Sequence, residues 1–155
     1  MALINWFPGH MAQAKRKLSN ALASVDVVVE VLDARMPAAS MNPLFDELRK
    51  ERQRPALKIL NKADLADQAV TAHWIEYFMD VNSSASALPI IGKSKHDVRK
   101  IIDSCHKLAP HRVDAIKPLR LMVSGVPNVG KSTILNGLLG QSKAKAADEP
   151  AITKM

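Results

Sequence analysis

Cysteine is nearly absent from this chain, and long apolar runs are missing. The 155 residues include one cysteine, Cys105, so no disulfide can form within the chain, and no Cys/His cluster has zinc-ligand spacing. The longest strongly apolar run, residues 27–32, is interrupted by Glu30 and is far shorter than the ~20 residues of a membrane-spanning helix. The amino-terminal sequence also lacks the basic start and apolar core of a secretory signal. We therefore expect a cytoplasmic protein without a membrane-spanning segment.

The chain has the composition of a globular domain with an excess of basic residues. Hydrophobic residues make up 47% and charged residues 24% of a length that fits one domain. Lys and Arg number 22 against 15 Asp and Glu, which gives a net charge of +7. The basic residues gather at positions 15–17, 49–54, 93–100 and 143–145. This excess favours a polyanionic partner such as RNA, although each cluster alone is read more simply as a solvated helix face.

Strand and helix patterns alternate along the chain. Short runs rich in Val, Ile and Leu predict strands, at residues 26–35, 55–60, 88–91 and 120–125. Apolar spacing and capping residues predict helices, at residues 9–24, 43–53, 71–80 and 95–108, with another beginning near Lys131. Strands separated by helices need right-handed crossovers. The sequence therefore predicts an α/β fold with a doubly wound, mostly parallel sheet covered on both faces.

Some buried side chains can also be predicted from helical spacing. Cys105 falls on the apolar stripe of the helix over 95–108, so we expect a core thiol and not a reactive one. In the helix over 71–80, the spacing predicts that Trp74, Tyr77 and Phe78 face inward.

A phosphate-binding motif follows the last predicted strand. The sequence GVPNVGKS, at residues 125–132, fits the pattern G-x-x-x-x-G-K-[ST] between a strand and a helix. Glycines there allow a tight backbone ring whose N–H groups point at phosphate oxygens, next to the positive end of the helix. In such a loop Lys131 neutralises the β and γ phosphates, and the Ser132 hydroxyl is a ligand for Mg²⁺. The candidate phosphate-binding residues are Asn128, Val129, Gly130, Lys131, Ser132 and Thr133.

A base-reading motif, NKAD at residues 61–64, ends the second predicted strand. The Asp64 carboxylate can accept hydrogen bonds from the N1–H and the exocyclic amine of guanine, a pair of donors that adenine does not offer. Asn61 would tether the site, and the stem of Lys62 would lie on the base. Alone, the tetrapeptide could also be an Asx turn that opens a helix. Because both motifs follow parallel strands, together they predict one guanine nucleotide site.

With these motifs the chain resembles a known family. The base motif precedes the phosphate loop, which reverses the order of the translation-factor class of P-loop GTPases. Together with WFPGHM at residues 6–11 and VLDARMPAASMNP at 31–43, this order resembles the YlqF/RbgA family of circularly permuted ribosome biogenesis GTPases. The resemblance implies that the protein binds GTP and GDP with Mg²⁺ and hydrolyses GTP during assembly of the large ribosomal subunit. The implied partners are the precursor of that subunit and its rRNA.

The resemblance also assigns roles to single residues. His10 would manage the attacking water where other GTPases use Gln, unless it only caps the first helix. Asn128 would help hold K⁺ between the phosphates, or it makes only a hydrogen bond that stabilises the loop. Residues 91–93 stand where the family has a Ser-Ala-Lys loop, and a backbone N–H there, with Gly92 as the candidate, would contact guanine O6. Thr153 would be the switch threonine and, with Ser132, a Mg²⁺ ligand.

Other elements of the family pattern do not occur in this sequence. The family has two further strands around an Asp-x-x-Gly metal motif, and a C-terminal RNA-binding domain. Without the strand that ends in Asp-x-x-Gly, the strand at 120–125 would be an open apolar edge. We therefore expect residues 1–155 to be an incomplete circularly permuted GTPase domain that lacks the switch region and the RNA-binding domain. Asp33 and Arg35, at the end of the first strand, are expected to pair or to position the amino-terminal segment, without catalysing.

Two other functions stay open from the residues. A P-loop kinase or ATPase would show no guanine preference, and the NKAD motif argues against it. A nucleotide-gated RNA- or ribosome-binding chaperone, in which hydrolysis is incidental, would keep its association with the ribosome when His10 is replaced.

Overall fold

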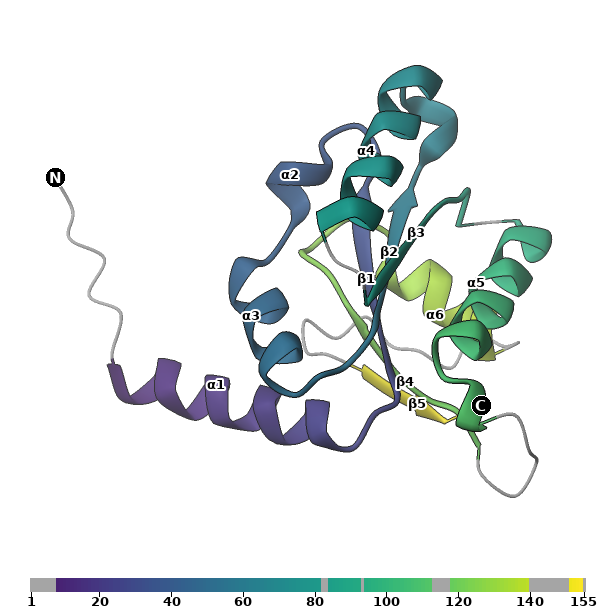
Figure 1. The fold of residues 1–155 in the computed structure, drawn as a ribbon. Helices are drawn as coiled ribbons and strands as arrows, with labels where there is room; N and C mark the ends of the chain where they lie inside the picture. The colour runs from purple at the N-terminus through teal and green to yellow at the C-terminus, as the bar shows by residue number, and fades with distance from the viewer. Residues whose placement is uncertain (1–7, 82–83, 93, 113–117, 140–150, 155) are drawn as a thin grey trace, which may run out of the picture.

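One sheet with helices on both faces organises the molecule (Figure 1). The computed structural model describes residues 8–81, 84–92, 94–112, 118–139 and 151–154, with only the backbone for the last range and for Pro8, His10, Asp80 and Val81. The strand order is β3-β2-β1-β4-β5. The strands are β1 (Val27–Asp33), β2 (Ala56–Asn61), β3 (Ala85–Pro89), β4 (Arg120–Ser124) and β5 (Ala151–Lys154). The first four are parallel, and β5 is antiparallel to β4.

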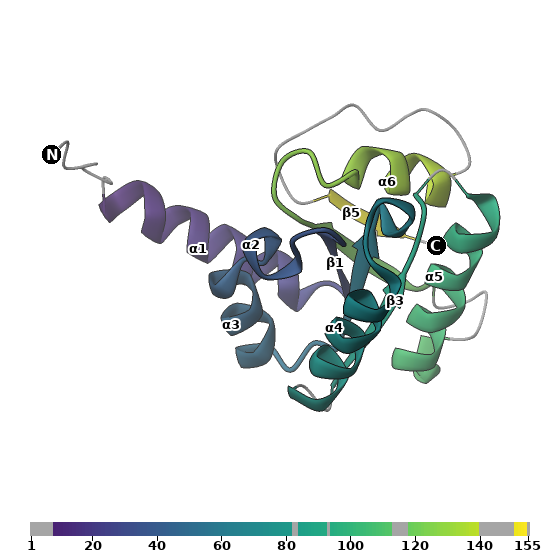
Figure 2. The same ribbon diagram turned by 90° about the horizontal axis from the view of Figure 1, so that it is seen from above.

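The helices form a layer on each face of the sheet (Figure 2). They are α1 (Pro8–Ala23), α2 (Pro37–Ser40), α3 (Pro43–Glu51), α4 (Gln68–Val81), α5 (Lys95–Leu108) and α6 (Lys131–Leu139), with 3-10 turns at η1 (Ala63–Leu65) and η2 (Pro110–Arg112). Helices α5 and α6 cover one face, and α1, α3 and α4 cover the other. Among the described residues, no helix combines the length and apolar content that crossing a membrane requires. This arrangement confirms the predicted doubly wound α/β fold.

The central strand β1 is apolar on both sides because both of its faces are covered. Val29 and Val31 point into a core that includes Ile101 and the fully buried Cys105 of α5. On the opposite face, Val28 packs in a cluster under α1 and α3. The thiol of Cys105 is therefore a core group, as its spacing predicted, and burial raises its pKa to about 12.

Glu30 and Lys58 are charged side chains inside these apolar strands. They are neighbours in the β1–β2 register, and the Lys58 ammonium donates to the Glu30 carboxylate. The other Glu30 oxygen accepts the Asn42 backbone N–H at 3.2 Å, and Lys58 Nζ lies 3.5 Å from Asp46 Oδ1. Arg49, also buried, donates to Asp46 at 2.8 Å. Each buried charge thus has a partner of opposite sign, which is the condition for burying charges without a large penalty.

The second half of α1 anchors this helix to the molecule. Leu22 is fully buried against α3, with Leu18 partly buried beside it. Arg54 donates to the last carbonyl groups of the helix, to the oxygen of Leu22 at 3.1 Å and of Ala23 at 2.9 Å. These contacts occupy C=O groups that a helix end leaves unpaired. The first turn of α1, in contrast, projects from the body of the molecule in both views (Figures 1 and 2).

Several predicted details of the elements are confirmed and others are wrong. Helix α5 has the predicted bounds, and Asn42 caps α3 by accepting the Phe45 N–H at 3.4 Å. The third strand begins three residues earlier than predicted, because residues 85–87 pair with β2 although they are not strongly apolar. Tyr77 does not face inward: it is 50% exposed, whereas Phe78, one position further around α4, is buried.

The open edge expected at β4 is not present. Residues 151–154 form β5 and pair antiparallel with residues 120–123 of β4. A bare strand presents unpaired N–H and C=O groups, so pairing with any available segment is favourable. The expectation of a bare edge was therefore wrong.

Candidate nucleotide site

The two sequence motifs meet at the carboxyl edge of the sheet. Strands β1 and β2 end side by side, with Asp33 paired in register with Asn61. Strand β4 lies on the other side of β1 and leads into the phosphate loop. Loops that follow neighbouring parallel strands form the usual crevice for ligands in α/β sheets.

Asn61 connects three loops through one buried side chain. Its Nδ2 donates to the Val129 carbonyl oxygen in the phosphate loop at 2.8 Å, and its Oδ1 accepts the Gly92 N–H after β3 at 2.9 Å. The amide also explains a glycine of the loop. A Cβ at Gly130 would overlap Asn61 Nδ2, and the Gly130 φ of 97° is unfavourable for other residues. The tethering role predicted for Asn61 is thus visible in the structure.

Lys62 forms a second link between the motifs. Its backbone is left-handed, with φ 59°, and its Nζ donates to the Asn128 carbonyl oxygen at 2.8 Å. Asn128 is itself left-handed, with φ 66°. The Lys62 side chain therefore crosses from the base motif to the phosphate loop.

The phosphate loop closes around its own lysine. Lys131, the first residue of α6, donates from Nζ to the Gly125 carbonyl at 2.5 Å and lies 3.5 Å from that of Val126. A Cβ at Gly125 would lie only 2.6 Å from the Val31 carbonyl oxygen, which explains the glycine at this position. The loop lies at the N-terminus of α6, where the helix dipole attracts anions. This end of β4 is therefore suited to a phosphate group.

The oxygen ligands that this loop offers fit Mg²⁺ if a bound nucleotide and water supply most of its other ligands. Ser132 places a half-buried hydroxyl in the first turn of α6, and Thr133 beside it is exposed. Within the described residues, no group of three His, Cys, Asp or Glu could hold a metal without further ligands. Mg²⁺ usually takes few protein oxygens together with phosphate oxygens and water. Ser132 fits that role.

The base-reading edge lies beside a cavity of about 420 Å³ between the start of α4 and the first turn of α5. Asp64 is exposed and lines this cavity together with Ile91 and Asp97. Asp97 Oδ2 accepts the Ile91 N–H at 3.0 Å, and the Gly92 N–H is donated to Asn61. Both N–H groups are thus already engaged, so the predicted contact of Gly92 with guanine O6 is not supported. The third member of the predicted loop, Lys93, lies outside the described residues.

Asp33 and Arg35 pair with each other, which is one of the two predicted alternatives. Asp33 Oδ1 accepts both the backbone N–H and the Nε of Arg35 at 3.0 Å, and Oδ2 accepts Nη2 at 2.8 Å. Hydrogen bonds from the Arg35 side chain hold the pKa of the Asp33 carboxyl well below its usual range. Lys62 Nζ lies 3.4 Å from the same Oδ2. Sequence reasoning missed this contact to Lys62, because no local pattern relates residues 29 positions apart.

Two predicted site residues are not brought to the phosphate loop. His10 belongs to the first turn of α1, which projects from the body, and its side chain lies outside the described residues. Thr153 is paired in β5 with Leu121, three residues before the end of β4, so its backbone does not lie beside Ser132. The structure therefore does not place Thr153 as a Mg²⁺ ligand.

The site and fold together define a class of protein. A phosphate loop follows β4, and a guanine motif follows β2 earlier in the chain, which is the arrangement of a circularly permuted P-loop GTPase. The family model described as 50S ribosome-binding GTPase matches residues 120–155. The chain is also 39% identical to Ribosome biogenesis GTPase A of Bacillus cereus, over 97% of this chain and 52% of that protein.

Solved structures agree with this assignment. GNP-bound YlqF from Thermotoga maritima superposes with a TM-score of 0.60 at 34% identity and covers 83% of this chain and 48% of that one. A GDP-bound structure of TM YlqF gives a TM-score of 0.59 at 33% identity, over 81% of this chain and 48% of that one. The chain is thus a relative of the YlqF/RbgA ribosome biogenesis GTPases, as its motifs indicated. It spans about half the length of the curated relatives it matches.

Proposed function

We propose that this protein binds GTP and GDP and hydrolyses GTP during assembly of the large ribosomal subunit, with residues 1–155 forming one GTPase domain. The observation that carries the proposal is the double link between the two motifs. Asn61 bonds to Val129 and Lys62 bonds to Asn128, so the base motif and the phosphate loop are held as one site. A kinase or ATPase would need the same phosphate loop but has no use for the guanine motif.

In this proposal each described residue acts on a particular part of the nucleotide. Asp64 accepts hydrogen bonds from the guanine N1–H and amine, and the stem of Lys62 lies against the base. Lys131 leaves the carbonyl groups of its own loop and pairs with the β and γ phosphates. The Ser132 hydroxyl would hold Mg²⁺, and the bound ion would supply positive charge for the negative charge that the transferred phosphate gains. Asn128 would help to hold K⁺, which would supply further positive charge to the site.

Hydrolysis also needs a group that positions the attacking water. We assign this role to His10, as the family resemblance implies. The first turn of α1 projects from the body of the molecule. In this role, the turn that contains His10 must therefore approach the phosphate loop when a ribosomal particle is bound. The proposal therefore includes slow hydrolysis without that particle.

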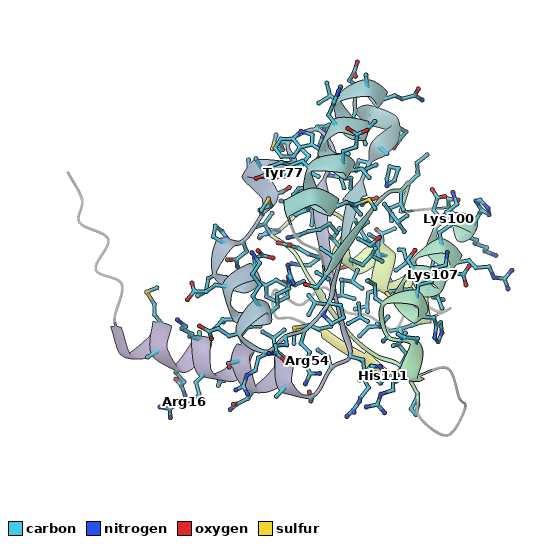
Figure 3. All side chains as sticks on the ribbon, viewed as in Figure 1. Arg16, Arg54, Tyr77, Lys100, Lys107 and His111 are labelled. Atoms are coloured by element: carbon cyan, nitrogen blue, oxygen red, sulfur yellow. The ribbon has the colours of Figure 1, made fainter. Side chains whose placement is uncertain are left out.

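The distribution of basic residues supports a ribosomal RNA partner. Helix α1 contains Lys15, Arg16 and Lys17 and no acidic residue. Arg16 and Arg54 lie along one edge of the molecule, and Lys107 lies on α5 (Figure 3). Surfaces of this charge attract the phosphate backbone of nucleic acids. A cytoplasmic location, where the large subunit is assembled in bacteria, belongs to the same proposal.

Calorimetric titration of the complete chain with GDP and with ADP tests the nucleotide assignment. The unmodified chain should prefer GDP, and Asp64→Ala should abolish the preference, because unpaired donors on the base cost ~1–3 kcal/mol, or about one to two decades of affinity. Asp103→Ala is the matched control, since it removes an exposed carboxylate of α5 that does not line the cavity. Equal affinities of the unmodified chain for GDP and ADP would refute the guanine assignment.

A further inference from the structure

Asp33 belongs to neither nucleotide motif, yet it contacts Lys62 of the base motif directly and, through Lys62, is linked to the phosphate loop. Its side chain, at the end of β1, is buried and is shared between two cations. Arg35 donates to both carboxylate oxygens, and Lys62 Nζ lies 3.4 Å from Oδ2. The same Nζ donates to the Asn128 carbonyl at 2.8 Å. The Lys62 ammonium therefore lies between an acceptor on the sheet and an acceptor on the phosphate loop.

The backbone at Asp33 is as firmly held as its side chain. Its N–H donates to Ser40 Oγ at 3.0 Å, and this hydroxyl in turn donates within α2. Hydrogen bonds from the Arg35 side chain lower the pKa of Asp33 and so favour its ionised form. A lysine side chain, in contrast, has a flexible four-carbon stem that costs entropy to fix. A fixed negative charge next to Lys62 offsets part of that cost before any nucleotide arrives.

We propose that Asp33 is a positioning residue of the nucleotide site, which holds the Lys62 ammonium against the Asn128 carbonyl and so fixes the base motif relative to the phosphate loop. This inference rests on the proposed guanine nucleotide site. Asp33 acts through Lys62 and does not itself touch the nucleotide. Loss of the carboxylate frees Lys62 and loosens both motifs, so bound GDP dissociates faster.

The test measures GDP affinity by calorimetry and GDP release by stopped flow, for the complete chain and for Asp33→Asn, which keeps the shape and removes the charge. We expect about tenfold weaker binding, the size of one hydrogen bond to a charged group, and we expect it mainly in the release rate. Lys62→Met should weaken binding as well, and the double variant should be no weaker than Lys62→Met alone. Losses that multiply in the double variant would overturn the proposal, because Asp33 would then act independently of Lys62.

A matched control lies at the other end of the same strand. Asp26, immediately before β1, is a buried carboxylate that accepts from Arg112 Nε at 3.0 Å and from the Arg120 N–H at 2.9 Å. Asp26→Asn should lower the unfolding midpoint and leave the GDP affinity of the folded protein within about twofold, since this site is remote from both motifs. If Asp26→Asn and Asp33→Asn weaken GDP binding equally, the effect is general destabilisation and the proposal is wrong.

A second variant, Asp33→Glu, and a titration with ADP cover the remaining outcomes. If Asp33→Asn does not fold, Asp33→Glu keeps the charge but displaces it by one methylene, and its GDP release should be faster than that of the unmodified chain. An unchanged release rate would refute the positioning role. The unmodified chain is titrated with ADP in parallel. If the unmodified chain does not prefer GDP to ADP, the proposed guanine site itself is wrong. If it does prefer GDP but the Asp33 variants bind and release GDP normally, only the inference on Asp33 is refuted.

Discussion

Replacing Asn61 with alanine should destabilise the protein even without nucleotide. The side chain is buried, and its removal leaves the Val129 carbonyl and the Gly92 N–H without their partner. Each of these two unsatisfied buried groups costs ~1–3 kcal/mol, so the expected loss is about 2–6 kcal/mol in the free energy of unfolding. For a chain of this length each kcal/mol shifts the midpoint temperature by about 2–4 °C, which gives a decrease of about 4–24 °C.

Urea unfolding followed by circular dichroism, without nucleotide, measures this loss. Asn61→Asp is an informative second variant, because it keeps an acceptor for Gly92 but loses the donor to Val129 and places a charge near that carbonyl. It should be at least as destabilised as Asn61→Ala. Asn42→Ala is the matched control, since it removes only the cap of α3 and should cost ~1 kcal/mol. A change below about 0.5 kcal/mol for Asn61→Ala would show that neither hydrogen bond contributes as argued.

The other predictions concern the loop, the cores and the proposed catalytic residue. Gly130→Ala should abolish GDP binding in a calorimetric titration, because its Cβ would displace the Asn61 amide; retained affinity would contradict this clash. Cys105, with a pKa raised to about 12, should react with a thiol reagent at pH 8 only after urea unfolds the chain, and a fast reaction in the folded state would disprove its burial. Lys58→Met should cost ~3–5 kcal/mol in urea unfolding, because a buried carboxylate loses its cation, and a neutral result would mean that water reaches that pair. His10→Ala should reduce GTP hydrolysis stimulated by large-subunit particles by ~10²–10⁴-fold and leave GDP affinity unchanged; unaffected turnover would make His10 a helix-capping residue.

The features that the sequence predicted correctly are those that depend on residues close to them along the chain. Helix α5 was predicted with its bounds because its apolar stripe is regular, and the structure adds a local cap from Ser94. The phosphate loop was predicted because a left-handed backbone and close packing leave few residue types possible at Gly125 and Gly130. Both signals lie within a few residues of the feature they predict.

Features that depend on distant partners were not predicted. Strand β3 begins earlier than its apolar run because β2 supplies the hydrogen bonds, whatever the side chains of residues 85–87. Strand β5 follows likewise from the unpaired edge of β4 and not from its own composition. The link from Asp33 to Lys62 joins segments that only the folded chain brings together.

Helix α1 is anchored at its C-terminal end only, so its first turn can move further than the rest of the helix. Its 16 residues span about 24 Å, and its buried contacts and the Arg54 hydrogen bonds lie in the second half. A rotation of about 20° around that end would move the first turn by about 8 Å while disturbing few of the anchoring contacts. A small rotation caused by contacts to the basic residues 15–17 would therefore displace the backbone of His10 by several times the movement at the anchored end.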